Sequence, residues 1–160
     1  MVQPSMITDD MRKSIGVILG TQTVEVDKRW IIRFTEVMDD SNPLYDEQAA
    51  KEGPYGELIA PPSFVYGFHI SGRPQGIFRM PVDIPSPPVD GGGEWEFFEP
   101  VRPGDVITIT TKISDLYERE GKSGALLFVI HELECKNQKG QLVCRYRMTH
   151  ICRQVLEREN

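Results

Sequence analysis

The C-terminal half of the chain alternates between apolar and polar residues in a way that predicts β-strands. Within residues 94–101, Trp95 and Phe97 point to one side and Glu94 and Glu96 to the other. Residues 126–135 are apolar on both faces, which is typical of a strand in the middle of a sheet. The same reasoning predicts strands over residues 106–117 and 142–153, and an early strand over residues 21–26.

Helical spacing is found in the N-terminal half instead. Asp27 can cap a helix that extends to residue 38, in which one apolar face is expected from Trp30, Ile31, Phe34, Val37 and Met38. A shorter helix is predicted over residues 46–52. A third begins at Pro62 or Ser63, continues to residue 70, and is apolar nearly all round, so it is expected to be buried. Residues 73–93 are rich in proline and glycine, which predicts a long irregular connection.

One buried helix followed by a meander of long antiparallel strands predicts an α+β fold, in which the sheet wraps around a central helix. No repeat, low-complexity tract or long linker divides the chain, so residues 1–160 are expected to form a single domain. A sheet of this kind leaves a long edge unpaired. Pairing with a second copy or with a related chain is the expected remedy.

Charge and composition narrow the range of partners. The chain has 160 residues, a net charge of −6 and a pI of about 5.1, which argue against nucleic acid and against an anionic membrane. No apolar run reaches the ~20 residues that span a bilayer, and the polar N-terminus is not typical of a secretory signal. Three cysteines without a Cys-x-x-Cys pair indicate reduced thiols in a cytoplasmic protein.

Two segments carry the strongest functional signal: Asp40-Ser41-Asn42-Pro43-Leu44-Tyr45, and Ile59-Ala60-Pro61-Pro62-Ser63-Phe64. They resemble the active-site region of the MaoC-type hydratases, which have the hot-dog fold and add water to enoyl thioesters. In that family the first segment reads Asp-x-Asn-Pro-Leu-His, and its Asp and His together handle the attacking water. Asp40 matches the Asp, but Tyr45 stands in the position of the His.

The resemblance spans nearly the whole chain and is strongest for the subgroup called the N-terminal MaoC dehydratase domain. That subgroup includes small mycobacterial subunits of the hydroxyacyl carrier-protein dehydratase, in which a subunit with degenerate catalytic residues pairs with a complete one. The resemblance therefore implies Asp40 and Tyr45 as the catalytic positions. It implies a substrate-binding role for Asn42, Pro62, Ser63, Phe64 and Tyr66, some of which would line an acyl tunnel.

Two departures from the family pattern weaken this chain's own catalysis. A phenol, with an ordinary pKa of about 10, is a poor base at neutral pH, although it can still donate a hydrogen bond. The family's oxyanion donor is a glycine N–H at the start of the central helix, and Pro62 aligns there without an N–H to give; the Ser63 N–H is the nearest substitute. A general base contributes roughly 100- to 10,000-fold. One oxyanion donor contributes roughly 100- to 1,000-fold.

Three functions stay open from the sequence. The favoured one is a non-catalytic, substrate-binding subunit of an enoyl-thioester hydratase or 3-hydroxyacyl-thioester dehydratase, paired with a homologous catalytic subunit. The others are a self-sufficient homo-oligomeric hydratase, and an acyl-CoA thioesterase or acyl-binding protein. Each would use an acyl thioester of CoA or of an acyl carrier protein, and none implies a metal or redox cofactor.

Other residues have structural interpretations that we prefer. The buried helix carries His69, which is expected to be a core residue, and Gly91-Gly92-Gly93 is expected to be a flexible connection. Arg145 and Arg147 share one side of the last strand, where they either contact CoA phosphates or pair with acids of the neighbouring strand. The five remaining candidates for a metal site are expected to be buried side chains on neighbouring strands: Cys135, Cys144, Cys152, His131 and His150.

Overall fold

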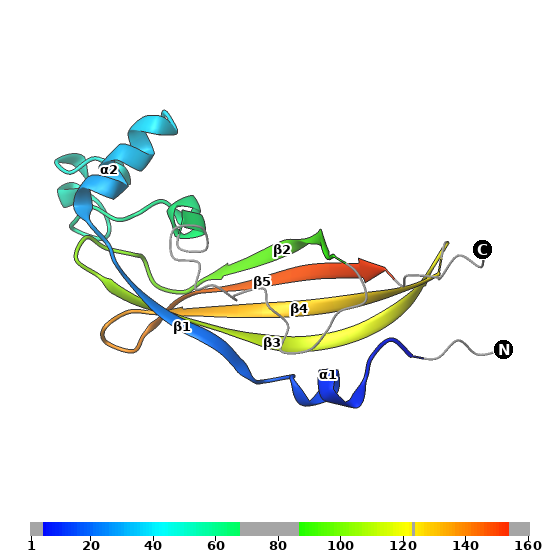
Figure 1. Cartoon of the computed structure of the whole chain (residues 1–160). Helices are drawn as coiled ribbons and strands as arrows, with labels where there is room; N and C mark the ends of the chain where they lie inside the picture. Colours follow the sequence, from blue (N-terminus) through cyan, green and yellow to red (C-terminus); the bar gives the residue numbers. More distant parts are fainter. Residues whose placement is uncertain (1–4, 68–86, 123, 154–160) are drawn as a thin grey trace.

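The computed structural model describes residues 5–67, 87–122 and 124–153. Its elements are α1 (Asp9–Lys13), β1 (Ile18–Glu25), α2 (Lys28–Val37), three 3₁₀ helices, η1 (Pro43–Tyr45), η2 (Ala49–Glu52) and η3 (Pro62–Val65), and the strands β2 (Val89–Phe97), β3 (Val106–Gly121), β4 (Gly124–Lys136) and β5 (Leu142–Arg153). The five strands form one antiparallel sheet in the order β1-β3-β4-β5-β2 (Figure 1). The predicted α+β class and the central position of β4 are therefore confirmed.

The core lies on one face of this sheet. Along β4, Leu127, Val129, Leu133 and Cys135 are buried at every second or fourth position, which places them on the same face. Near η3 and α2 this face packs into a cluster around Leu133. Further along the strands, Leu127 and Val129 join Met11 of α1 in a second cluster. Helix α1 thus covers one stretch of the long sheet, and α2 together with η3 covers another.

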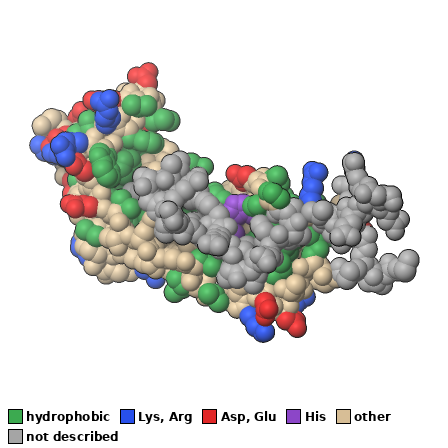
Figure 2. All heavy atoms as spheres, in the orientation of Figure 1, with side chains coloured by type: hydrophobic (Ala, Val, Ile, Leu, Met, Phe, Trp, Pro, Cys, Tyr) green, Lys and Arg blue, Asp and Glu red, His purple; other side chains and the backbone are tan. Residues whose placement is uncertain are grey.

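Helix α2 begins where the sequence predicts, with the Asp27 carboxylate accepting a hydrogen bond from the Arg29 N–H at 2.8 Å. The apolar residues of this helix are not all buried, however. Ile31 is buried, but Trp30 and Val37 are 56% and 76% exposed. The reason is position, because α2 lies at one end of the sheet and only a narrow stripe of it meets the core (Figure 1). Hydrophobic side chains accordingly gather on the surface at this end of the molecule (Figure 2).

The two later helices are shorter than predicted within the described residues. Residues 46–52 do not form one helix, because the Asp46 carboxylate accepts hydrogen bonds from the N–H groups of Gln48 and Ala49 and makes a local turn before η2. The third helix starts at Pro62, as predicted, but as 3₁₀ turns that become helical at Tyr66. The remainder of that predicted helix, including His69, lies outside the described residues.

The three glycines expected in a flexible connection instead belong to β2, which begins at Val89. A Cβ on Gly93 would lie 2.4 Å from the Tyr146 ring, and a Cβ on Gly91 would lie 2.8 Å from Ile151. Between them, Gly92 has a φ of +110° at a shift in the pairing of β2 with β5. These glycines therefore allow an edge strand to lie closely on β5, and the irregular-connection prediction is wrong for residues 89–93.

Candidate functional site

The loop after α2 is ordered by hydrogen bonds between residues that are two positions apart. The chain turns at Asp39, which has a φ of +51°. The Asp40 carboxylate then accepts a hydrogen bond from the Asn42 N–H at 3.1 Å. The Asn42 side chain in turn accepts one from the Leu44 N–H at 3.0 Å and caps η1. Asp40 and Asn42 thus shape the loop that presents Tyr45.

Three of the predicted site residues, Asp40, Asn42 and Tyr45, line the same open cleft of about 530 Å³. The cleft lies between α2, the loop and η2. Its polar and acidic lining residues include Thr35, Glu36, Asp39, Ser41 and Asp46. The structure thus brings the catalytic positions of the family motif together on one surface. It also surrounds them with carboxylates, which are hydrogen-bond acceptors and carry negative charge.

Tyr45 is partly buried in this site. Burial raises the pKa of its phenol above the ordinary value of 10, and the negative charge of Asp40 and the neighbouring Tyr55 raise it further. At neutral pH Tyr45 is therefore protonated. It can donate a hydrogen bond, but it cannot take a proton from water as a neutral imidazole would.

Tyr45 also lines a second hollow, of about 330 Å³. Its walls are mostly apolar and come from η1, from the segment that leads into η3, from the end of β2 and from the start of β5. The lining residues include Tyr45, Pro62, Val65, Phe98, Val101 and Val143. Tyr45 is the one residue that lines both hollows in this part of the described chain.

The remaining predicted residues lie around η3. Pro62 lines the apolar pocket and is exposed, as is Ser63. Phe64 is buried, and its ring meets that of Phe34 edge-on at 5.5 Å, which makes it part of the core. Tyr66 is 46% exposed and its ring lies 6.3 Å from that of Trp95. These residues therefore do not share a single surface with Asp40.

Sequence reasoning missed Tyr55, Phe98 and Glu99, which help to line the apolar pocket. No motif marks them. Phe98 and Glu99 reach the pocket because the segment after β2 runs beside residues 59–62, where the Ala60 N–H donates to the Val101 carbonyl at 2.8 Å. A contact of that kind has no local signature in the sequence.

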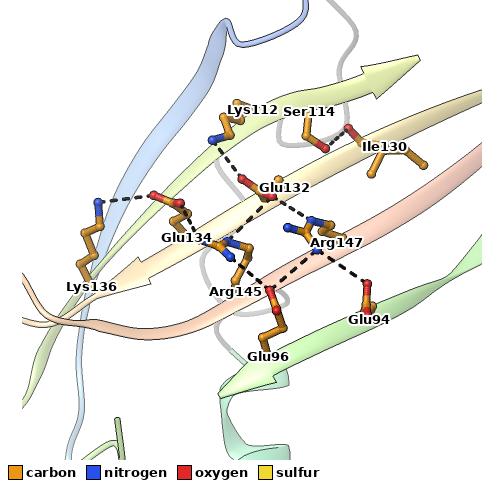
Figure 3. A network of polar contacts seen from close by, with 10 residues as sticks. All are labelled: Glu94, Glu96, Lys112, Ser114, Ile130, Glu132, Glu134, Lys136, Arg145 and Arg147. Carbon is orange, nitrogen blue, oxygen red and sulfur yellow. Dashed lines mark hydrogen bonds and ion pairs between the residues drawn. The ribbon is translucent and has the colours of Figure 1, made fainter. Parts of the chain in front are cut away.

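Arg145 and Arg147 pair with acids on neighbouring strands, which decides between the two interpretations of these residues. Arg147 donates to the Glu132 carboxylate at 2.9 Å, and Arg145 lies 3.2 Å from Glu96 (Figure 3). Lys112 also pairs with Glu132 at 2.9 Å. Four acids and four bases, on β2, β3, β4 and β5, alternate across the face of the sheet opposite the core (Figure 3). Their charges are mutually neutralised, so this face offers little to a phosphate.

The three cysteines and His131 are buried, as predicted, whereas His150 is only half-buried. Cys135 lies opposite Cys144 in the β4–β5 pairing, and all three cysteines are free thiols. The Nδ1 atoms of His131 and His150 are 3.0 Å apart. Within residues 5–67, 87–122 and 124–153, no three His, Cys, Asp or Glu side chains are grouped so that they could hold a metal ion. In the same part of the chain, no helix has the length and apolar character to span a membrane.

Comparison with known proteins now identifies the family. The family model described as FAS1-like, dehydratase domain region, matches residues 13–146. A relative called UPF0336 protein, from Streptomyces avermitilis, is 35% identical over 104 residues, which are 63% of this chain and 69% of the relative.

Two solved structures share the fold. The MaoC-like dehydratase from Rhodospirillum rubrum has a TM-score of 0.67 and 22% identity, with 89% of this chain and 94% of that one covered. The HadBC (3R-hydroxyacyl-ACP dehydratase) complex from Mycobacterium tuberculosis has a TM-score of 0.69 and 23% identity, with 87% and 97% covered. The chain belongs to the FAS1-like dehydratase region family and has the hot-dog fold of the MaoC-like dehydratases.

Proposed function

We propose that this chain is the non-catalytic, substrate-binding subunit of an enoyl-thioester hydratase, which works in the cytoplasm with a homologous catalytic subunit. The observation that carries the proposal is Tyr45, a phenol with a raised pKa in the position where the MaoC-type motif has its histidine. Pro62 gives further support, because it aligns with the family's oxyanion donor and has no N–H to offer the thioester oxygen.

The chemistry explains why these two residues matter. In hydration, the water oxygen bonds to the β-carbon of the enoyl thioester while a base takes its proton, and the α-carbon gains a proton as the double bond is lost. Negative charge develops on the thioester oxygen and needs a hydrogen-bond donor. Without the base and one donor, the losses estimated above multiply to roughly 10,000-fold or more. A companion chain with intact Asp and His would supply the base, and the glycine N–H at the start of its central helix would supply the donor.

The family and the fold neighbours support a companion of this kind. The chain belongs to a dehydratase region family, and one fold neighbour is the HadBC (3R-hydroxyacyl-ACP dehydratase) complex. The edge strands β1 and β2 each pair with one neighbour in the described sheet, and such edges are where a second hot-dog chain can add its own strands.

The test compares the purified chain with the same chain co-expressed with a MaoC-type protein that carries Asp-x-Asn-Pro-Leu-His. Hydration of crotonyl-CoA is followed by the loss of absorbance of the conjugated thioester. We expect activity only in the complex, and we expect Tyr45→Phe in this chain to leave it within about twofold, because the phenol is not the base.

Replacing the companion's motif aspartate by asparagine is the matched control and should abolish turnover. Robust hydration by the isolated chain would instead favour a self-sufficient hydratase, particularly if Asp40→Asn removed it. Release of free thiol from acyl-CoA would point to a thioesterase.

A further inference from the structure

The two hollows beside Tyr45 differ in chemistry but adjoin at one side chain. The cleft of about 530 Å³ carries carboxylates, hydroxyls and an amide beside Ile32, Pro43 and Ala49, whereas the pocket of about 330 Å³ is lined mainly by proline, valine and aromatic side chains. Because Tyr45 lines both, a ligand that occupied both would lie against this residue. A ligand that matches both is elongated, with a polar arm that bonds to the groups of the cleft and an apolar end that packs in the pocket.

The polar cleft favours a neutral arm that carries N–H and O–H donors. Asp39, Asp40 and Asn42 offer side-chain oxygens that accept hydrogen bonds. Phosphates would be repelled by the same carboxylates, so the phosphate end of a carrier cannot lie in this cleft. A pantetheine arm, with two amides and a hydroxyl between the phosphate and the sulfur, has the required chemistry.

The apolar pocket has a closed floor. Val65, Val101 and Val143 line it and are 3%, 5% and 0% exposed, so a ligand cannot extend past them without displacing the core. A water molecule takes up about 30 Å³ in the liquid, and a methylene group is of similar size. The pocket of about 330 Å³ therefore has room for roughly ten carbons.

We propose that the cleft and the pocket form one binding site for a medium-chain acyl thioester, with the pantetheine arm in the cleft, the thioester beside Tyr45, and the acyl chain in the pocket. This inference rests on the proposed function and deepens it by naming the length class of the acyl group. Phe98, which is 49% exposed at the pocket, is the side chain that covers the acyl end.

The experiment is calorimetric titration of the full isolated chain with 3-hydroxyacyl-CoA esters of four, eight, twelve and sixteen carbons. Each methylene that enters the pocket should tighten binding about two- to fourfold. We expect the affinity to rise up to roughly ten carbons and then to stop rising or to fall, because the valine floor admits no more.

Three variants separate the parts of the site. Phe98→Ala should weaken binding of the eight-carbon ester about tenfold while changing the four-carbon ester little. Ala49→Trp, which places an indole in the cleft from the exposed first residue of η2, should weaken all esters equally. Trp30→Ala removes an exposed aromatic side chain outside both hollows and is the control, so it should change neither. Circular dichroism of each variant confirms that it is folded.

Several results would overturn the site. Absence of binding, equal affinity for all four esters, or equal effects of Phe98→Ala and Trp30→Ala would each do so. The result is also separable from the proposed function. Hydration by the complex without this length pattern would refute the site alone, whereas the length pattern without hydration by any complex would refute the catalytic partnership alone.

Discussion

Leu133 and Asn42 show two ways in which this chain holds its structure. Leu133, in β4, lies opposite Thr111 of β3 and Tyr146 of β5, so its packing joins segments that are more than ten residues apart. Asn42 bonds only to the loop beside it, through Asp40 and the Leu44 N–H. The sheet therefore depends on contacts between distant segments, and the candidate site depends on contacts within one loop. Substitutions in the sheet should cost stability, and those in the loop should change the site.

The largest effect is expected in the sheet. Leu133 is 2% exposed, and Leu133→Ala should lower the free energy of unfolding by about 2–5 kcal/mol because it leaves a cavity in the core that covers the sheet. Urea unfolding at neutral pH measures this loss. Val37→Ala is the control, since Val37 is 76% exposed, and it should stay within about 0.5 kcal/mol. Similar losses in both variants would contradict the assignment of the core to this face of the sheet.

Features that depend on neighbouring residues could be predicted from the sequence, and features that depend on contacts between distant segments could not. Alternation located β3 and β5, and a run of residues that is apolar on both faces located β4. A single aspartate, Asp27, located the start of α2. The extent of β2 was missed, because glycines that favour a loop locally are required here by Tyr146 and Ile151 of the neighbouring strand.

The two hollows of the candidate site also differ in how far the sequence could predict them. The polar cleft could be predicted in part, since the residues of the motif, Asp40 to Tyr45, lie together in the chain and together on its surface. The apolar pocket could not be predicted, because Phe98 and Val143 reach it only through the pairing of β2 with β5. The raised pKa of Tyr45 likewise depends on burial, which the sequence does not record.

A smaller effect on the sheet should appear on acidification. Burial, and then the neighbouring His150, lower the pKa of His131 from 6.5 to about 4. Between pH 6.5 and about 4 the unfolded chain binds a proton at this residue that the folded chain does not, so stability is full above this range and falls as the pH is lowered through it. The loss should reach about 3 kcal/mol.

Urea unfolding at pH 7 and pH 4.5 measures this dependence for the wild type and for His131→Asn. The variant is expected to be less stable than the wild type at pH 7, but its free energy of unfolding should fall less on acidification. The quantity to compare is therefore the change in the free energy of unfolding between pH 7 and pH 4.5. His150→Asn, at a half-buried histidine whose pKa is also lowered, should reduce the dependence less. An unchanged pH dependence in His131→Asn would show that other groups govern acid sensitivity.

The smallest effect on stability is expected in the loop, where Asp40→Asn should change the free energy of unfolding by less than about 0.5 kcal/mol. The asparagine side chain still has an oxygen that can accept the Asn42 N–H bond, now 3.1 Å long, so the turn is retained. The negative charge is lost, however. The pKa of Tyr45 should therefore fall toward its ordinary value, while burial still holds it above 10.

Absorbance titration of the phenolate measures this change, and subtraction of the matching Tyr45→Phe variants isolates Tyr45 from the other tyrosines. Asp10→Asn, on the exposed side of α1, is the charge-matched control and should leave the Tyr45 titration unchanged. A stability loss above 1 kcal/mol in Asp40→Asn would mean that the loop needs the charge itself, so that Asp40 would be an electrostatic element of the fold. Unchanged stability with a lowered phenol pKa would show that the charge of Asp40 acts on Tyr45 in the site and contributes little to the stability of the fold.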